Sequence, residues 1–358
     1  MSNYEAYQGT RAVADAHRFD VAALERYLRD NIPGFEGPLE VAQFKGGQSN
    51  PTFELRAGGK AYVMRRKPPG KLLPSAHAVD REYRVITALG RTEVPVPRTY
   101  ALCTDESVIG TMFYVMDCVE GRVLWDPRLP GMQPAERGAI FSEMNRVIAA
   151  LHRVDFTAIG LADYGKPGNY FARQIDRWSK QYVASVTEPI EAMDRLMEWL
   201  PRNIPPGDRT TIVHGDYRLD NMIFHPTEPR VLAVLDWELS TLGHPMADFA
   251  YHAMVWRLSA TEFRGLRGSD LAALGIPDET EYLDMYLARV GAGERPTAKD
   301  WEFYIAFNLF RAAAIFQGVM ARAVAGNAAS AQALETGRRA RPTAELAWRQ
   351  VGQLLAKS

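Results

Sequence analysis

HGDYRLDNMIF, residues 214–224, is followed after six residues by VLAVLDWE, residues 231–238. Asp216 stands five residues before Asn221, and Asp236 follows fifteen residues after Asn221, at the end of an apolar run. Short apolar runs beside polar loops predict two strands here. The stretch therefore combines a carboxylate and an amide in one loop with a second carboxylate at a strand end.

These three side chains suit the transfer of a phosphoryl group to a hydroxyl. That reaction needs a carboxylate near the nucleophile and oxygen ligands for Mg2+, and little covalent chemistry from the protein. We expect Asp216 to accept or orient the hydroxyl proton, and Asn221 and Asp236 to hold Mg2+ against the phosphate oxygens of ATP. Arg218, in the same loop as Asp216, is expected to balance negative charge on the transferred group.

Upstream of this stretch the chain begins with a predicted helix and continues with strands. FDVAALERYLRDNI, residues 19–32, places its apolar residues on one face, and Asp20 can cap that helix. Residues 39–70 then predict three strands, the second and third joined by a hairpin at Gly58 and Gly59.

A second helix and two further strands follow. SAHAVDREYRVITAL, residues 75–89, has helical spacing, while residues 94–103 and 111–121 read as strands. We therefore expect residues 40–117 to form a small, mostly antiparallel sheet with one helix inserted after its third strand, which is a pattern of the α+β class.

Beyond residue 121 helices dominate. Residues 133–155 and 170–200 carry apolar residues at helical spacing. WEFYIAFNLFRAAAIFQGVM, residues 301–320, approaches the length that spans a membrane but contains Glu302 and Arg311. We interpret it as a buried helix of a soluble core and expect no membrane partner.

Composition narrows the class of protein. The chain has 358 residues, beyond the usual size of a single core, so two lobes sharing a cleft are expected. Its formal net charge of -1 offers no bulk attraction to nucleic acid, which favours a small-molecule substrate. The two cysteines, Cys103 and Cys118, and the lack of a secretory pattern in MSNYEAYQGT predict a cytoplasmic protein. No feature sets an oligomeric state.

H-x-D-x-x-x-x-N followed by a strand and a second Asp resembles the catalytic loop and metal-binding Asp of the protein-kinase-like superfamily. HGDYRLDN with LDWE specifically resembles the aminoglycoside phosphotransferase family. Within it, GGQSNPTFEL and YVMRRKPPGKLLPSAHAVDREYRVI are most similar to the kinase-like domains associated with acyl-CoA dehydrogenases. The resemblance runs from about Gln43 to about Ala323 and implies a bilobal α+β fold, with an N-terminal nucleotide-binding lobe in residues 1–117 and a helical C-terminal lobe in residues 118–358.

The resemblance also implies where the nucleotide binds. In FKGGQSNPTF the phosphates would be approached by the backbone of four residues: Gly46, Gly47, Gln48 and Ser49. The alternative is that this segment is a turn that binds no ligand.

A cation on the third strand is implied to pair with Glu82 on the following helix. Arg65 occupies the lysine slot of the kinase pattern, and Lys67 lies two residues later on the same face. Two solvated surface charges are the alternative reading.

The segment FYVMDCVEG is implied to join the lobes. The backbone of Asp117 to Val119 would meet the adenine edge, and Met116 would line the base pocket, unless that methionine is simply part of the core.

Further residues are expected to support the loop rather than react. We expect His214 to brace it and Asp248 to anchor the region structurally, while His152 is interpreted as a cap or core histidine. Arg311, a lone cation in an apolar helix, needs a partner: we favour an internal carboxylate over an anionic substrate group.

The acceptor and two rival classes stay open at this point. Resemblance to the dehydrogenase-associated domains suggests a hydroxy acid or hydroxyacyl-CoA, with aminoglycoside, choline or sugar as alternatives. A metallophosphoesterase would need more His and Asp ligands than the sequence offers at strand ends. A nucleotide-binding pseudokinase usually lacks the base or a metal ligand, whereas Asp216, Asn221 and Asp236 are all present.

Overall fold

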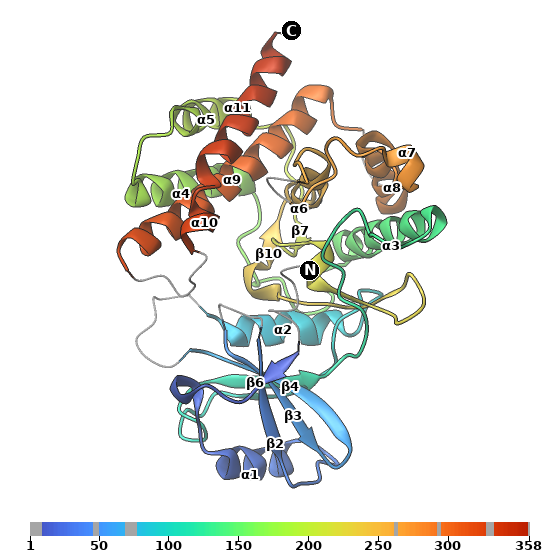
Figure 1. Ribbon diagram of the computed structural model, residues 1–358, viewed down its shortest axis with the longest axis vertical. Helices are drawn as coiled ribbons and strands as arrows, with labels where there is room; N and C mark the ends of the chain where they lie inside the picture. The colour runs from blue at the N-terminus through green and yellow to red at the C-terminus, as the bar shows by residue number, and fades with distance from the viewer. Residues whose placement is uncertain are drawn as a thin grey trace. The chain divides into compact units, whose positions relative to one another are not determined.

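The computed structural model describes residues 9–45, 50–68, 77–260, 264–291, 295–326 and 333–356 (Figure 1). The chain divides into two compact units. Unit 1 comprises Met1–Trp125, Phe156–Tyr164 and Leu219–Ser240, and unit 2 comprises Asp126–Asp155, Gly165–Arg218 and Thr241–Ser358. These units do not coincide with the expected lobes 1–117 and 118–358. Unit 1 also contains Phe156–Tyr164 and Leu219–Ser240, which lie later in the chain.

A six-stranded antiparallel sheet forms the centre of unit 1. Its order is β1-β2-β3-β4-β6-β5, with the strands β1 (Thr10–Arg11), β2 (Glu40–Phe44), β3 (Thr52–Ala57), β4 (Lys60–Arg66), β5 (Thr99–Cys103) and β6 (Phe113–Asp117). The predicted hairpin joins β3 to β4, where Gly58 and Gly59 both have the positive φ that such a turn requires. The predicted antiparallel sheet is confirmed.

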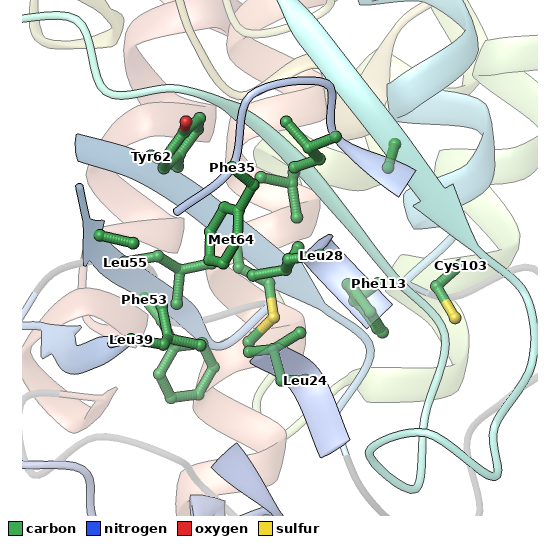
Figure 2. Close-up of a cluster of buried hydrophobic side chains, with 14 of the residues drawn as sticks. Leu24, Leu28, Phe35, Leu39, Phe53, Leu55, Tyr62, Met64, Cys103 and Phe113 are labelled. Carbon is green, nitrogen blue, oxygen red and sulfur yellow. The ribbon is translucent and has the colours of Figure 1, made fainter. Parts of the chain in front are cut away.

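One face of this sheet packs against α1 (Val21–Asn31), as Figure 2 shows. The Asp20 carboxylate caps the helix by accepting the N–H of Ala23 at 2.9 Å. Leu24 and Leu28 then point from α1 toward Met64 of β4, and none of these three side chains is exposed. This apolar layer fixes which face of β4 is turned away from α1.

The opposite face of the sheet carries α2 (Val79–Leu89), which contacts β5 and β6. Side chains alternate along a strand, so Arg65 faces away from the layer that holds Met64. Glu82 is buried on α2 together with the apolar residues of the helix. Alternation in β4 and helical spacing in α2 therefore place a base and an acid on the same side of the sheet.

The loop that begins with His214, Gly215 and Asp216 is called the HGD loop. Unit 1 is completed by the segment that follows this loop, Leu219–Ser240. It contains the turn η3 (Leu219–Asn221), the antiparallel strands β8 (Met222–Phe224) and β9 (Val231–Val234), and the turn η4 (Trp237–Leu239). The predicted pair of strands is confirmed. The short turn η2 (Asp15–His17) precedes α1 at the other end of the unit.

Unit 2 is mainly helical. Its helices are α3 (Pro134–Arg153), α4 (Tyr170–Ser185), α5 (Glu191–Arg202), α6 (Pro245–Ala253), α7 (Leu271–Leu274), α8 (Glu279–Val290), α9 (Ala298–Val324), α10 (Ala333–Gly337) and α11 (Ala340–Leu355), with the turn η5 (Met254–Trp256). The strands β7 (Thr211–Val213) and β10 (Thr241–Gly243) pair antiparallel. In the sequence, β7 precedes the HGD loop and β10 follows η4.

The long helix α9 is the predicted apolar helix of residues 301–320. By length and composition it could cross a membrane, but 72% of its most apolar stretch is buried inside the protein. It packs against α4, α5, α6, α10 and α11, so its apolar side chains are covered by other helices of unit 2. These contacts are those of the predicted buried core helix.

The layer between α1 and the sheet should dominate the stability of unit 1. Leu28→Ala removes a fully buried side chain and should lower the free energy of unfolding by about 2 to 5 kcal/mol. Val21→Ala, on the same helix at a site 38% exposed, should cost far less. Urea unfolding of both variants measures the difference, and equal losses would contradict this packing.

Candidate active site

Arg65 of unit 1 is surrounded by three carboxylates, although its side chain is only 10% exposed. Its Nη1 donates to Oε1 of Glu82 at 2.9 Å, and its Nη2 donates to Oδ1 of Asp236 at 2.7 Å and to Oε2 of Glu238 at 3.3 Å. A buried cation needs such partners. The expected pair with Glu82 is therefore present, while its role in nucleotide binding stays a prediction.

The excess of negative charge in this cluster affects the ionisation of Glu82. One guanidinium faces three carboxylates, and within the described residues Oε2 of Glu82 and Nε of Arg65 are buried without a hydrogen-bond partner. Burial raises the pKa of Glu82 to about 7; Arg65 opposes that shift, whereas Asp236 and Glu238 add to it. A bound cation would relieve this repulsion.

The β8–β9 ladder brings Asn221 and Asp236 to the same end of two strands. Met222 pairs with Val234, and the N–H of Leu235 donates to the carbonyl of Asn221 at 2.8 Å. Asn221 therefore immediately precedes β8 where Asp236 follows β9, which explains their spacing in the sequence. Two oxygen-bearing side chains at one strand end match the small set of protein ligands that Mg2+ takes beside phosphate oxygens and water.

Asp236 has an unusual backbone conformation. It adopts φ 65° and ψ 58°, in the left-handed region that residues with a Cβ seldom occupy. Its side chain remains 34% exposed while one oxygen is held by Arg65. Such strain is maintained where a side chain must be aimed in one direction. The carboxylate is thus both fixed and accessible, and together with Asn221 it fits the expected metal-ATP group.

The described residues contain no group of three or more His, Cys, Asp or Glu side chains able to hold a metal ion by themselves. A two-residue site completed by the phosphates of the nucleotide is therefore the arrangement that the expected ligands allow. The phosphate-loop residues of the prediction lie outside the described residues: Gly46, Gly47, Gln48 and Ser49. Lys67 follows the last residue of β4, and its N–H donates to the carbonyl of Met112 at 3.0 Å.

The expected adenine-binding segment lies at the end of β6. Met116 is buried within this strand, and the Asp117 carboxylate accepts the hydroxyl of Tyr100. The N–H of Asp117 already donates to the carbonyl of Arg98 at 2.8 Å. A base edge would therefore meet other backbone groups, among them the N–H of Val119, which lies beyond the strand.

In unit 2 a buried carboxylate anchors the HGD loop. Asp248 of α6 is 2% exposed and accepts the N–H of His214 at 2.7 Å and of Gly215 at 2.8 Å. His152 lies 3.3 Å from the same carboxylate and also hydrogen-bonds to Tyr286. Burial alone would raise the pKa of Asp248, but the hydrogen bonds and charges of His152 and His214 lower it below its ordinary value. Asp248 is an anionic anchor, in agreement with its predicted structural role.

The loop braces itself as well. The Nδ1 of His214, a fully buried ring, accepts the N–H of Asp216 at 3.1 Å, so that nitrogen carries no proton. Gly215 has φ 84°, which only glycine adopts freely. These contacts are those of the predicted brace.

Two polar side chains meet the Asp216 carboxylate. The hydroxyl of Tyr251 donates to its Oδ1, and the Nε of Arg218 lies 3.2 Å from the same oxygen. Asp216 is 20% exposed and Arg218 is 47% exposed, so the pair lies at the surface of unit 2. The structure thus joins the predicted base to the predicted charge-balancing arginine.

The expected carboxylate partner of Arg311 is corrected by the structure. Arg311 donates to the carbonyl of Gly215 at 2.6 Å, and its guanidinium carbon lies 5.2 Å from the ring centroid of Tyr251 and 5.7 Å from that of Trp178. The partner is internal, but it consists of a carbonyl and two aromatic faces. A carbonyl dipole and ring quadrupoles satisfy the guanidinium without neutralising its charge.

Sequence reasoning missed two residues of these clusters. Glu238 is the third carboxylate on Arg65, and Tyr251 is the donor to Asp216. Both had a signal: Glu238 lies two residues after Asp236, and Tyr251 lies three residues after Asp248, hence on the same face of one helix.

Two buried histidines belong to α6 or its cap. His244 caps the helix by accepting the N–H of Met246 at 3.2 Å, and His252 hydrogen-bonds to the hydroxyl of Tyr282 at 2.8 Å. Burial lowers the pKa of each histidine to about 4. The helix that carries Asp248 and Tyr251 is therefore packed through neutral imidazoles.

Comparison with known proteins supplies a family. Residues 40–299 match the model of the phosphotransferase enzyme family. The mouse acyl-CoA dehydrogenase family member 10 is 48% identical over 342 residues, which cover 95% of this chain and 32% of that protein. The chain spans less than half the length of the curated relatives that it matches.

Similar solved structures point to the same family. The structure of a candidate aminoglycoside phosphotransferase from Ralstonia eutropha is 62% identical, with a TM-score of 0.86 and coverage of 94% of this chain and 99% of that one. The aminoglycoside phosphotransferase APH(4)-Ia, in ternary complex with AMP-PNP and hygromycin B, is 16% identical with a TM-score of 0.57, over 92% of this chain and 99% of that one. At that identity it shows the fold alone.

Acid should destabilise unit 2 through His244, which caps α6, and His252, which lies within it. Their folded-state pKa lies below the unfolded value of about 6.5, so the unfolded chain binds more protons between about pH 6.5 and pH 4, and stability falls as pH falls through this window. Each histidine should cost about 2 kcal/mol between about pH 7 and pH 5. Urea unfolding of His252→Gln should show a shallower pH dependence than wild type, with His225→Gln as control. Parallel pH profiles would refute this effect.

Proposed function

Since the chain belongs to the aminoglycoside phosphotransferase family of kinase-like enzymes, we propose that it transfers the terminal phosphoryl group of ATP to the hydroxyl of an anionic small molecule, a hydroxy acid or hydroxyacyl-CoA. One observation carries the proposal. The β8–β9 ladder aligns Asn221 with Asp236, and the residues just before this ladder hold Asp216 on a rigid loop.

The donor side of the reaction uses unit 1. Asn221 and Asp236 would hold Mg2+, and Arg65 would bind phosphate oxygens once they compete with Asp236 and Glu238 for its Nη2. ATP-Mg supplies the phosphoryl group with its charge partly neutralised. Glu82 keeps Arg65 in place through Nη1, because that contact does not involve the nitrogen that would turn to the phosphate.

The acceptor side uses Asp216 of unit 2. Transfer breaks the bond between the terminal phosphorus and its bridging oxygen and forms a bond from phosphorus to the acceptor oxygen. The acceptor loses its proton, which Asp216 takes up. Asp216 and Asn221 are five residues apart, so their Cα atoms are separated by at most about 18 Å, and the reaction requires both to reach the same nucleotide.

Positive charge near Asp216 supports an anionic acceptor. Arg218 is half-exposed beside the carboxylate, and Arg311 contacts a carbonyl and two aromatic rings. The guanidinium carbon of Arg177 lies 5.3 Å from the ring centroid of Trp178, the same indole that Arg311 contacts. Two arginines at one indole, together with Arg218 beside Asp216, would attract a carboxylate or phosphate and repel a polycationic aminoglycoside.

The relatives' names support the same acceptor class. The mouse relative is named an acyl-CoA dehydrogenase family member, and its segment similar to this chain makes up 32% of its length. A name that refers to acyl-CoA thioesters supports a hydroxyacyl-CoA as the acceptor. Coenzyme A carries phosphates and an adenine ring, so arginines and an indole suit it as well as the acyl group.

The acceptor class is tested by a screen of ATP consumption with hydroxy acids, their CoA thioesters, amino alcohols and aminoglycosides. We expect turnover with the anionic compounds and a loss of at least about 100-fold in Asp216→Ala, because the carboxylate acts in the transition state. Equal ATP consumption by wild type and Asp216→Ala with every compound would overturn the transferase proposal and leave a nucleotide-binding module.

The metal ligands are tested separately from the base. Asn221→Ala and Asp236→Ala should abolish Mg2+-dependent turnover, while the unfolding midpoint remains close to that of wild type for Asn221→Ala. Asp220→Ala, at the neighbouring position of the same loop, serves as the matched control for a local disturbance. An undiminished rate in Asp236→Ala would disprove the metal assignment.

A further inference from the structure

One turn of α6 reaches the HGD loop at two points. Asp248 and Tyr251 are three residues apart and therefore lie on the same face of the helix. Asp248 accepts the backbone N–H groups of His214 and Gly215, and the Tyr251 hydroxyl donates to Oδ1 of Asp216. The first contact fixes the path of the backbone, and the second reaches the carboxylate itself.

The Tyr251 hydroxyl is a lasting donor. Burial raises the pKa of Tyr251 far above its ordinary value, and the negative charge of Asp216 raises it further, against the opposing effects of Arg218 and Arg311. The phenol therefore keeps its proton throughout the range in which a kinase works. A carboxylate oxygen can only accept, so the direction of this hydrogen bond is settled.

The ring of Tyr251 is held as firmly as its hydroxyl. The guanidinium of Arg311, from α9, lies 5.2 Å from the ring centroid while it donates to the carbonyl of Gly215. Arg311 is itself 7% exposed and also contacts the ring of Trp178. A swing of the tyrosine would thus break a cation-π contact and disturb the residue next to Asp216.

We propose that Tyr251 is a positioning residue for Asp216, an inference that rests on the proposed function. Its hydroxyl fixes the rotation of the carboxylate about the Cβ–Cγ bond, and Arg218 contacts the same oxygen from the exposed side. Because the two carboxylate oxygens are rigidly linked, holding Oδ1 also sets the direction of Oδ2. The carboxylate then meets the acceptor hydroxyl without searching among orientations, which benefits the chemical step rather than substrate binding.

The test is Tyr251→Phe, which removes the hydroxyl and leaves the ring for Arg311. With ATP and the CoA thioesters of α-, β- and γ-hydroxybutyric acid, kcat should fall about tenfold to 100-fold, while KM for ATP and for the thioester changes less than about twofold. Replacing Tyr251 with p-aminophenylalanine restores a donor and should recover part of kcat. A residue that merely supported the fold would gain nothing from a donor.

Tyr182→Phe is the matched control, because it removes a buried hydroxyl that accepts the N–H of Ile190 in the same unit. It should leave kcat unchanged and lower the unfolding midpoint about as much as Tyr251→Phe does. Wild-type kcat in Tyr251→Phe, with Asp216→Ala inactive, would overturn the positioning role and leave the proposed function standing. A rise in KM that accounts for the whole loss would also overturn it. If wild type transfers phosphate to none of the three thioesters, a hydroxyacyl-CoA acceptor is excluded, and the same variants are compared with the hydroxy acid that the screen identifies.

Discussion

The constraint on which the candidate active site depends is the buried carboxylate of Asp248. A charge that is 2% exposed must be hydrogen-bonded, and two of its donors are the consecutive N–H groups of His214 and Gly215. These hydrogen bonds hold the loop that contains Asp216 against α6, the helix that contains Asp248. Gly215 turns in the left-handed region between these contacts, and Arg311 binds its carbonyl. The loop is therefore held through its backbone, and the Asp216 side chain is left for Tyr251 and Arg218 to orient.

Unit 1 shows the complementary situation, an excess of carboxylates around one cation. Arg65 contacts Glu82, Asp236 and Glu238, at a site where burial and the neighbouring carboxylates raise the pKa of Glu82. A cation bound beside Asp236 would offset part of this repulsion. Asp236 combines a left-handed backbone with a side chain that is 34% exposed and whose Oδ1 accepts from Arg65. Unit 2 thus holds Asp216 on an anchored loop, and unit 1 holds an arginine with an excess of carboxylates around it.

Local patterns predicted most of the fold. The sheet, the hairpin at Gly58 and Gly59, the Asp20 cap and the buried helix α9 all follow from periodicity and turn chemistry, which act over a few residues. Such patterns do not predict tertiary partners, because Arg65 contacts Glu238, a residue 173 positions away in the sequence. The pair with Glu82 could be predicted only through the family resemblance, and Arg311 was assigned a carboxylate because charge balance does not reveal a carbonyl. The units differ from the expected lobes for the same reason: compactness depends on contacts between distant segments.

We propose that this chain moves a phosphoryl group from ATP to an alcohol. Phosphorus NMR of wild-type protein with ATP, Mg2+ and a hydroxyacyl-CoA tests it most directly, because it identifies the product rather than the consumption of ATP. The account predicts a new phosphate monoester resonance, coupled to the proton on the carbon that bore the hydroxyl, that appears at the same rate as ADP. ADP accompanied only by inorganic phosphate, at equal rates with and without the acceptor, would contradict it.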